Sequence, residues 1–320
     1  MTSTSYTLRV PATTANLGPG FDSLGLALNV HNTFTIRLLE PGRFEAAAEG
    51  PEAIDLYLHP HNNMVTQSFL KGFELGGGTT APGVALHVDT HIPTTRGLGS
   101  SSSAVVAGLV AGYHAARGSL DWPALLEAMT ALEGHPDNVL SATLGGIVCG
   151  AWQPGTLLHL RRVLPDTLVA LAYIPDTRLS TKRARAAIPH EIPHTDAVYN
   201  AARTPLVMEA FYTGDLEMLM WAMRDRLHQP FRAPLIDSWE AVEAFARQNR
   251  LPFALSGAGP TIIMWCRRED VEGFEVDFRT SHPELMQRGQ VRILCPSNEG
   301  MRCPELEGLP RPTRRLTPQA

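Results

Sequence analysis

The residues with the clearest chemical potential lie at 93–112, where the sequence reads PTTRGLGSSSSAVVAGLVAG. Two glycines and four consecutive serines precede a run of small apolar residues that predicts a helix. The N-terminus of a helix favours an anion, because unpaired backbone N–H groups and the positive end of the helix dipole meet there. Gly97 and Gly99 permit the backbone conformations that a close approach to phosphate oxygens requires. The stretch therefore predicts an anion-binding loop whose serine hydroxyls can bind phosphate or a magnesium ion.

This loop differs from the common nucleotide-binding loops. A Walker A loop needs a lysine after its second glycine, and neither Lys71 nor Lys182, the two lysines of the chain, follows such a stretch. The segment GLGSSS lacks the third glycine of the dinucleotide-binding motif, and the protein-kinase signatures are absent. Backbone amides, the helix dipole, serine hydroxyls and a magnesium ion would have to replace the missing ammonium.

Two further stretches stand near the ends of the chain: VPATTANLGPGFDSLGLAL at 10–28 and ALSGAGPTIIMW at 254–265. With the serine-rich loop between them, they resemble the three ordered motifs of the GHMP kinase superfamily. The ATP loop of that superfamily reads P-x-x-x-G-L-G-S-S-S-A, and this chain has one extra serine. The segments LEGHPDNV at 132–139, STKRAR at 180–185 and HQPFR at 228–232 resemble the homoserine kinase branch. The resemblance covers about residues 6–300. It implies ATP-dependent phosphorylation of the L-homoserine hydroxyl, on the path to threonine.

The resemblance also implies a pocket for a small zwitterion. Arg185 and Arg232 would bind the carboxylate, because a fork-shaped guanidinium can donate two hydrogen bonds to it. Asp22, helped by Asn16, would bind the ammonium. The residues expected beside the acceptor hydroxyl are His135, Asn138 and Thr181.

Two neighbouring residues could lie beside the acceptor hydroxyl, and they imply different destinations for its proton. Many GHMP kinases place an aspartate near the acceptor hydroxyl, whereas the homoserine branch has an asparagine there, which is Asn138 in this chain. An amide accepts no proton at neutral pH, so Asn138 would orient the hydroxyl while the proton passes to the γ-phosphate. Asp137 is the alternative, as a base. We favour orientation by Asn138, and the residues assigned to catalysis are Asn138, His135 and Arg185.

ATP and Mg²⁺ are the implied cofactors. The superfamily pairs a loop serine with a glutamate upstream of the H-x-D-N segment. The alignment of GLGSS favours Ser100 or Ser101, with Glu133 as the carboxylate and Glu127 in reserve. Ala131 stands where related sequences have a further acidic residue. The residues expected to contact ATP are Asn63, near the adenine, and Pro93, Arg96, Gly97, Leu98, Gly99, Ser100, Ser101, Ser102 and Ser103.

Other interpretations of these residues remain. Arg183 and Arg185 could be solvated helix charges, His135 a turn residue and Asp22 a helix N-cap. A superfamily member acting on a mevalonate-type acid would use the arginines but has no ammonium for Asp22. A non-catalytic ATP-binding paralogue would need no site for a zwitterion, so a complete set of pocket residues weighs against it.

The composition narrows the range of binding partners and the cellular compartment. The net charge of −5 gives little support to binding of nucleic acid or of a membrane surface. The four cysteines form no C-x-x-C pair, which is typical of a reducing compartment. The N-terminal segment has no apolar core of a signal peptide, and no apolar run is long enough to span a bilayer. We therefore expect a cytoplasmic protein without nucleic-acid or membrane partners. The resemblance alone implies a homodimer.

Strands and helices alternate irregularly around these motifs. Hydrophobic periodicity predicts strands at 6–12, 32–39, 84–93, 145–152, 167–175, 290–296 and on both sides of the glycine turn in 252–266. It predicts helices at 64–77, 104–116, 121–134, 196–224 and 236–250.

This order indicates an α+β protein of two domains. A polar, irregular segment at 153–164 suggests the domain boundary. This gives an ATP-binding domain at 1–155, a second domain at 156–300 and a flexible Pro- and Arg-rich tail at 301–320. The resemblance implies the GHMP kinase fold. Its N-terminal domain would be like ribosomal protein S5 domain 2, and its C-terminal domain would be ferredoxin-like.

Overall fold

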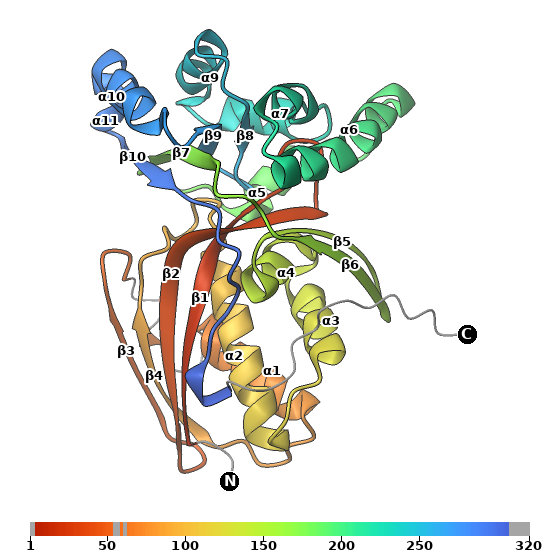
Figure 1. Cartoon of the computed structure of the whole chain (residues 1–320). Helices are drawn as coiled ribbons and strands as arrows, with labels where there is room; N and C mark the ends of the chain where they lie inside the picture. Colours follow the sequence, from red (N-terminus) through yellow and green to blue (C-terminus); the bar gives the residue numbers. More distant parts are fainter. Residues whose placement is uncertain (1–3, 54–57, 60–62, 307–320) are drawn as a thin grey trace.

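A six-stranded sheet organises the first half of the chain (Figure 1). This computed structural model describes residues 4–53, 58–59 and 63–306. The strands pair in the order β3-β4-β2-β5-β6, and β1 also pairs with β2. Their bounds are β1 Ser5–Ala15, β2 Leu24–Leu39, β3 Phe44–Glu49, β4 Gly83–Asp89, β5 Ile147–Gln153 and β6 Thr156–Arg162.

The antiparallel pair of β1 and β2 leads from the first domain to the second. In the first half of β1 the side chains of Tyr6, Leu8 and Val10 are buried and alternate with more exposed neighbours, as in a strand with one face on a core. The register shifts between Pro11 and Ala12, and from there to the end of β1 every residue is buried. The end of β1 therefore lies inside the molecule, where the two domains meet.

Four helices of the first domain are α1 Met64–Leu75, α2 Ser100–Arg117, α3 Trp122–Glu133 and α4 Asp137–Leu144. The helix α2 begins at Ser100, whereas the periodicity predicted its first residue as Ala104. Small residues let α2 be buried along nearly its whole length, in contact with α1, α3, α4 and β1. The early start puts the four consecutive serines into the first turn of the helix.

A four-stranded antiparallel sheet forms the second domain, in the order β10-β7-β9-β8. Its strands are β7 Leu168–Pro175, β8 Phe253–Leu255, β9 Ile262–Arg267 and β10 Gly289–Leu294. The helices are α5 Thr181–Ala186, α6 His194–Thr213, α7 Leu216–Ala222, α8 Gln229–Arg232, α9 Trp239–Gln248, α10 Val271–Ser281 and α11 Pro283–Met286, with the 3₁₀ turn η2 Ala233–Leu235. The 3₁₀ turn η3 Pro304–Leu306 packs against β1 of the first domain. Helices between β7 and β8 and between β9 and β10 make this a ferredoxin-like arrangement, so the expected α+β fold class is confirmed.

The expected domain boundaries need correction at two places. The boundary at 155/156 would divide the β5–β6 hairpin, because β6 pairs with β5 over its whole length. The sequence missed β6 because it is an edge strand with Leu158 and Leu160 exposed, so it shows no strong buried face. The start of the expected tail also belongs to the first domain: Arg302 pairs with Arg9, and Met301 and Leu306 are buried in the core of that domain. The predicted flexible tail beyond residue 306 lies outside the described residues.

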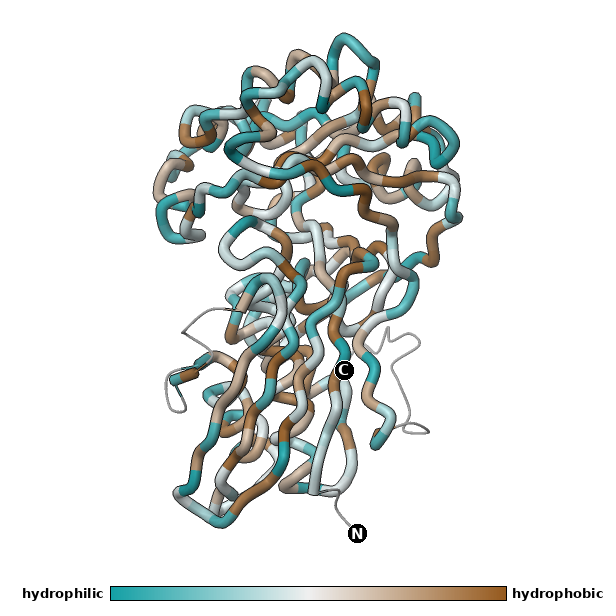
Figure 2. The backbone as a smooth tube through the Cα atoms, turned by 90° about the vertical axis from the view of Figure 1, so that its left-hand side faces the viewer, coloured by the Kyte–Doolittle hydropathy of each residue, from teal (hydrophilic) through white to brown (hydrophobic). Residues whose placement is uncertain are grey.

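A shared hydrophobic core joins the two domains. It combines Leu17 and Leu24 of the first domain with Ala170, Phe211 and Trp265 of the second. Figure 2 shows hydrophobic stretches running through the middle of both domains, with hydrophilic segments at the outer turns. Because the core is continuous, segments from both domains can hold fixed positions in one site.

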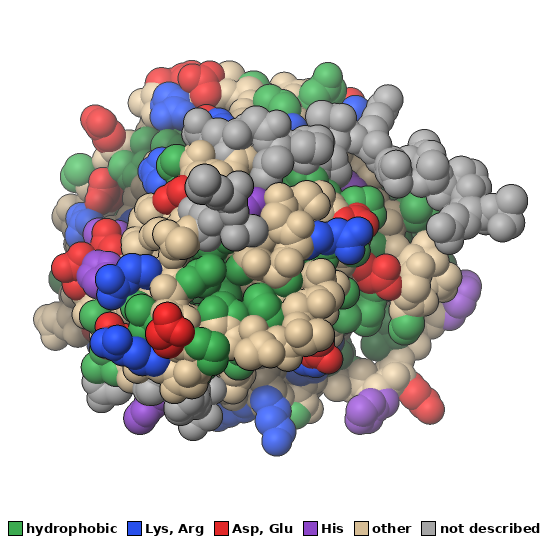
Figure 3. Space-filling view, turned by 90° about the horizontal axis from the view of Figure 1, so that it is seen from below, with side chains coloured by type: hydrophobic (Ala, Val, Ile, Leu, Met, Phe, Trp, Pro, Cys, Tyr) green, Lys and Arg blue, Asp and Glu red, His purple; other side chains and the backbone are tan. Residues whose placement is uncertain are grey.

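Among the described residues, no helix is both long and apolar enough to cross a bilayer. On the face seen in Figure 3, acidic and basic side chains are interspersed around a group of hydrophobic ones.

Candidate active site

A cavity of about 940 Å³ opens where the two domains meet. This volume lies in the range of small-molecule sites, about 300–1,000 Å³. Its walls come from the β1–β2 connection, α1, the serine-rich loop, the α3–α4 turn, α5, α8 and the turn between β8 and β9 at 256–259, called the SGAG turn below. The lining includes most of the expected site residues: Asn16, Asp22, Asn63, Pro93, Gly97, Leu98, Gly99, Ser100, Ser101, Ser102, Glu133, His135, Asn138, Thr181, Arg185 and Arg232.

The serine-rich loop forms one wall, with Gly99 as the N-cap of α2. Gly97 and Gly99 have φ values of +78° and +74°, which L side chains rarely adopt. A Cβ atom at Gly97 would lie 2.1 Å from the carbonyl oxygen of Ser256, and one at Gly99 would lie 1.9 Å from Thr13 Oγ1. Both glycines are therefore needed, and the N-terminus of an 18-residue helix faces the cavity. That arrangement favours a phosphate group.

The three sequence motifs meet at this loop. The hydroxyl of Ser256, in the SGAG turn, donates to the carbonyl oxygen of Gly97 at 2.6 Å. The backbone N–H of Thr13, in the first motif, donates to the carbonyl oxygen of Leu98 at 3.1 Å. Residues more than 200 positions apart thus fix the shape of one loop.

Two residues expected to contact ATP do not line the cavity. Arg96 forms an ion pair with Glu52 at 3.0 Å, with both side chains largely buried, and donates to the carbonyl oxygen of Asp176. Ser103 is fully buried on the inner side of α2, and its hydroxyl donates to the carbonyl oxygen of Ser100 at 2.8 Å. We therefore assign both side chains to holding the loop and not to direct contact with ATP.

Asn63 lines the cavity, but its side chain caps α1. Its Oδ1 accepts from the backbone N–H of Thr66 at 2.7 Å, and its Nδ2 donates to the carbonyl oxygen of His59 at 3.0 Å. This is the usual way in which an N-cap side chain satisfies the first turn of a helix. Contact of Asn63 with adenine stays a prediction.

Ser101 and Glu133 lie together at the loop. The Ser101 hydroxyl donates to Glu133 Oε1 at 2.9 Å, and both residues line the cavity. Burial raises the pKa of the Glu133 carboxyl, while the hydrogen bond from Ser101 and the charge of His135 oppose that rise. Hydroxyl and carboxylate oxygens are the donors that Mg²⁺ prefers, so this pair fits the ion. The reserve candidate Glu127 is outside the cavity lining and accepts from the backbone N–H of Gly155.

Asp22 and Arg185 form an ion pair at the other side of the cavity. The two nitrogens Nη1 and Nη2 of Arg185 donate to Oδ2 and Oδ1 of Asp22 at 2.8 and 2.9 Å. This pair raises the pKa of Arg185. Asn16 holds the loop that carries Asp22, because its Oδ1 accepts from the Asp22 backbone N–H at 3.0 Å. Arg185 therefore is no freely solvated helix charge.

Arg232 is a buried cation in the cavity wall, only 1% exposed. Its Nη1 donates to the carbonyl oxygen of Gly257 at 3.1 Å, and its Nε donates to that of Ala184 at 3.2 Å. Burial, and then the positive charge of Arg185, lower the pKa of Arg232 to about 10. It is still cationic at neutral pH. Two guanidinium groups thus face one cavity.

The H-x-D-N segment brings a histidine, an aspartate and an asparagine to the α3–α4 turn. His135 Nδ1 lies 2.5 Å from Asp137 Oδ1. Burial alone would lower the pKa of His135, but the charge and hydrogen bond of Asp137, with the charges of Asp22 and Glu133, raise it to about 9. The imidazole is therefore cationic at neutral pH, and Asp137 is its counter-ion.

Asn138 has its amide oriented by a residue that the sequence analysis did not single out. The hydroxyl of Thr13 donates to Asn138 Oδ1 at 2.7 Å. The backbone N–H of Asn138 donates to Asp137 Oδ1, also at 2.7 Å. Its Nδ2 donates to Asp137 Oδ1 at 3.3 Å, and an amide nitrogen carries a second N–H that can still donate. Thr13 lies in the motif VPATTANLG, so its place in that motif could have identified it as a site residue.

Two more residues near the cavity were missed. His228 and Asp225 lie behind Arg232 and are described below. The signal for Asp225 was its place three residues before HQPFR, where an aspartate can accept the N–H groups of a helix start. Thr181 was expected and does line the cavity, as the first residue of α5.

Comparison with known proteins agrees with this site. Residues 63–146 match the family described as GHMP kinases N terminal domain, and residues 207–298 match GHMP kinases C terminal. The chain is 36% identical to a homoserine kinase of Clostridium botulinum (strain Okra / Type B1), over 90% of this chain and 94% of that protein. It is 42% identical to a homoserine kinase of Gloeobacter violaceus, over 80% of this chain and 86% of that one.

A solved structure shows the same fold. The crystal structure of homoserine kinase from Cytophaga hutchinsonii superposes with a TM-score of 0.80 at 23% identity, covering 95% of this chain and 98% of that one. The two-domain arrangement, the three converging motifs and the relatives over most of the chain all point the same way. The chain belongs to the GHMP kinase superfamily and, within it, to the homoserine kinase family.

Proposed function

We propose that this protein transfers the γ-phosphoryl group of ATP to the hydroxyl of L-homoserine, giving O-phospho-L-homoserine and ADP. One observation carries the proposal: a cavity that presents Arg185, Arg232 and the carboxylate of Asp22 directly beside a loop suited to phosphate. Homoserine has one carboxylate, one ammonium and one hydroxyl. The cavity offers a group of matching chemistry for each.

The carboxylate of homoserine would be bound by Arg185 and Arg232. Guanidinium groups bind a carboxylate through paired hydrogen bonds, and burial strengthens the attraction. Arg185 now donates to the carboxylate of Asp22, and the carboxylate of the substrate would take the place of that acceptor.

The ammonium of homoserine would be bound by Asp22. One side-chain atom from each of Asp22, His135 and Asp137 lies within 4.8 Å of the others. Asp137 is already the counter-ion of His135, so Asp22 is the carboxylate that would bind the ammonium. Exchanging one internal ion pair for two contacts to a zwitterion leaves no charge in the cavity without a partner. An acid that lacks an ammonium would leave Asp22 uncompensated.

The hydroxyl of homoserine would be oriented by Asn138, with Thr181 nearby. The bond from the substrate oxygen to Pγ forms as the bond from Pγ to the β,γ-bridging oxygen breaks, and ADP leaves. The hydroxyl proton passes to the γ-phosphate. Asp137 is a poor base here because it is the counter-ion of a cationic His135. Positioning and charge neutralisation therefore provide most of the catalysis.

ATP would place its phosphates against Gly97, Gly99 and the first turn of α2. We propose Ser101 and Glu133 as the protein ligands of Mg²⁺, with Ser100 in the same turn as the alternative. The ion would supply the positive charge that neutralises the transferring phosphoryl group. A homodimer remains a prediction from the resemblance, and a cytoplasmic location remains a prediction from the composition and the cysteine spacing.

Two other functions fit the cavity less well. A kinase or decarboxylase for a mevalonate-type acid would not use Asp22, which the first motif and Asn16 hold in the cavity. A non-catalytic ATP-binding protein would not need two arginines around a zwitterion site. Phosphorus NMR of a reaction with Mg-ATP and L-homoserine tests the proposal. We expect a phosphomonoester signal that grows with ADP, and its absence would reject the function.

A further inference from the structure

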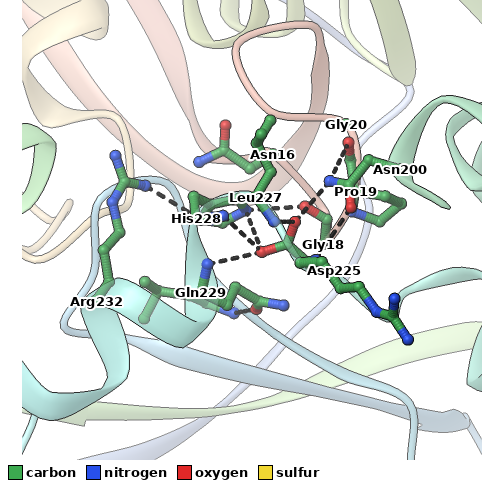
Figure 4. Close-up of polar contacts among 12 residues, drawn as sticks. Asn16, Gly18, Pro19, Gly20, Asn200, Asp225, Leu227, His228, Gln229 and Arg232 are labelled. Carbon is green, nitrogen blue, oxygen red and sulfur yellow. Dashed lines mark hydrogen bonds and ion pairs between the residues drawn. The ribbon is translucent and has the colours of Figure 1, made fainter. Parts of the chain in front are cut away.

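A buried carboxylate, that of Asp225, lies behind the proposed carboxylate pocket (Figure 4). The Asp225 side chain has no exposed surface. Its Oδ1 accepts from Asn200 Nδ2 at 2.6 Å and from the backbone N–H of Leu227 at 2.8 Å. Its Oδ2 accepts from the backbone N–H groups of His228 and Gln229 at 3.0 and 2.6 Å. These four donors stabilise the buried charge and fix the start of α8, the short helix that ends in Arg232.

The same network holds the loop that carries Asn16 and Asp22. Asn200, on α6, donates from its Nδ2 to the carbonyl oxygen of Pro19 at 3.2 Å as well as to Asp225. Thr204, one turn further along α6, donates its hydroxyl to the same Pro19 oxygen at 3.2 Å. The position of α8 is thereby tied to that of the 16–22 loop.

His228 links α8 directly to the 16–22 loop. Its Nε2 lies 2.8 Å from the carbonyl oxygen of Gly18, and its Nδ1 lies 3.3 Å from Arg232 Nη1. A carbonyl oxygen only accepts and a guanidinium only donates, so the proton must be on Nε2 and Nδ1 must accept. Phe21 stacks on the His228 ring at 5.2 Å, and Arg232 lies over Phe21 at 5.2 Å.

The surroundings keep this imidazole neutral. Burial lowers the pKa of His228, and the charge of Arg232 adds to that effect. Asp225, the Gly18 carbonyl and Asp22 act in the opposite direction without reversing it. A second proton on Nδ1 would face the Nη1–H group of Arg232 and break the contact.

We propose that Asp225 and His228 are positioning residues that hold Arg232 and the 16–22 loop in one substrate-binding arrangement, with His228 as the neutral Nε2–H imidazole. The inference rests on the proposed function, because it takes Arg232 as a ligand of the homoserine carboxylate. Neither residue lines the cavity, so both act through groups that do. Asp225 fixes where α8 begins, and His228 fixes how the Arg232 guanidinium is turned.

The test compares two substitutions of His228. In His228→Gln the amide lies about where Nε2 was, so it can still reach Gly18 but no longer contacts Arg232. In His228→Asn the amide lies about where Nδ1 was, so its oxygen can still accept from Arg232. We expect His228→Gln to raise the KM for homoserine on the order of tenfold to a hundredfold, because a misplaced binding group loses that much. His228→Asn should lose less, and the KM for ATP should not change in either variant.

A double-mutant cycle separates positioning from general support of the fold. If His228 acts through Arg232, then His228→Gln should lower kcat/KM for homoserine in the wild type but not in Arg232→Ala. An undiminished effect in the Arg232→Ala background overturns the proposal, as does a parallel change in the KM for ATP. His194→Gln, on the exposed start of α6, is the matched control and should leave all kinetic values unchanged.

A measurement on the unaltered protein needs no variant that folds poorly. Nitrogen-15 NMR of the histidine-labelled wild type should show His228 as the neutral Nε2–H tautomer from about pH 6 to about pH 8, across the usual range of histidine titration. A cationic ring or an Nδ1–H tautomer overturns the proposal. This readout uses no homoserine, so it remains decisive if the kinase assay itself were to reject the proposed substrate.

Discussion

Asp22 and Arg185 lie 163 positions apart in the sequence and form a two-point ion pair across the domain junction, at 2.8 and 2.9 Å. Asp22 comes from the β1–β2 connection of the first domain and Arg185 from α5 of the second. The negative charge of Asp22 is one that the ammonium of a bound amino acid would need, and the positive charge of Arg185 is one that its carboxylate would need. The pair therefore links the docking of the domains to the proposed recognition of a zwitterion.

Removing either arginine should impair use of homoserine. We expect Arg232→Ala and Arg185→Ala to cost about 2–5 kcal/mol, or roughly 30-fold to several-thousand-fold in kcat/KM. Arg232 should lie at the upper end because it is buried, whereas the Arg185 side chain is 45% exposed and more screened by water. Steady-state kinetics at saturating ATP measures this. Arg183→Ala, on the exposed side of the same helix, is the control. Near-normal kinetics in both variants would place the carboxylate elsewhere.

Asp22 should distinguish a zwitterion from an acid. Asp22→Asn removes the charge that faces the ammonium, and we expect a loss of roughly 30-fold or more in kcat/KM for homoserine, the lower end of the range for a charge left unpaired. The same variant should matter far less for 4-hydroxybutanoate, which is homoserine without its ammonium. The two substrates are compared in wild type and variant. Equal losses for both would show that Asp22 does not contact the ammonium.

The metal assignment predicts which residues control the dependence on Mg²⁺. Ser101→Ala and Glu133→Gln should each raise the Mg²⁺ concentration needed for half-maximal activity at least about tenfold, as loss of a supporting group at metal sites commonly does. Glu127→Gln is the matched control on α3, because its carboxylate is bonded to the β5–β6 turn. If Ser100→Ala shifts the Mg²⁺ dependence and Ser101→Ala does not, then the ligand is Ser100.

His135 should make the stability of the fold depend on pH. Its pKa of about 9 in the folded protein exceeds the ordinary value of 6.5, so its ionisation stabilises the folded state. The stabilisation, about 3 kcal/mol, is fully present below pH 6.5 and is lost as the pH rises through about 9.

Urea denaturation of wild type and His135→Gln over this pH range measures the effect. The difference in unfolding free energy should shrink as the pH rises, and His190→Gln, at an exposed position, should show no such trend. A difference that is constant with pH would mean that His135 is neutral in the folded protein.

Much of this site could be predicted from the sequence because its parts are local. The serine-rich loop, the first motif and the SGAG turn are each short runs whose glycines and hydroxyls have a chemical reason to stand together. The strands and helices that position them show clear periodicity. β6 was missed because an edge strand with exposed leucines carries no strong alternation.

The parts that could not be predicted depend on packing between distant segments. Arg96 stands within the loop motif, yet its partner is Glu52, and only the fold brings the two together. Ser101 and Ser103 differ in role because α2 begins at Ser100, which turns one hydroxyl to the cavity and the other inward. Asp225 lies in the polar segment RDRLH, where an aspartate is expected at the surface. The structure shows that it is buried and accepts from four donors.

L-homoserine is the proposed acceptor of the phosphoryl group. Coupled measurement of ADP release, with Mg-ATP and a panel of L-homoserine, L-serine, L-threonine and mevalonate, tests it most directly. We expect kcat/KM to be highest for L-homoserine, because it alone presents a carboxylate, an ammonium and a hydroxyl at the spacing that the pocket of Arg185, Arg232, Asp22 and Asn138 would serve. Faster turnover of mevalonate, or binding of Mg-ATP without ADP release for any member of the panel, would contradict it.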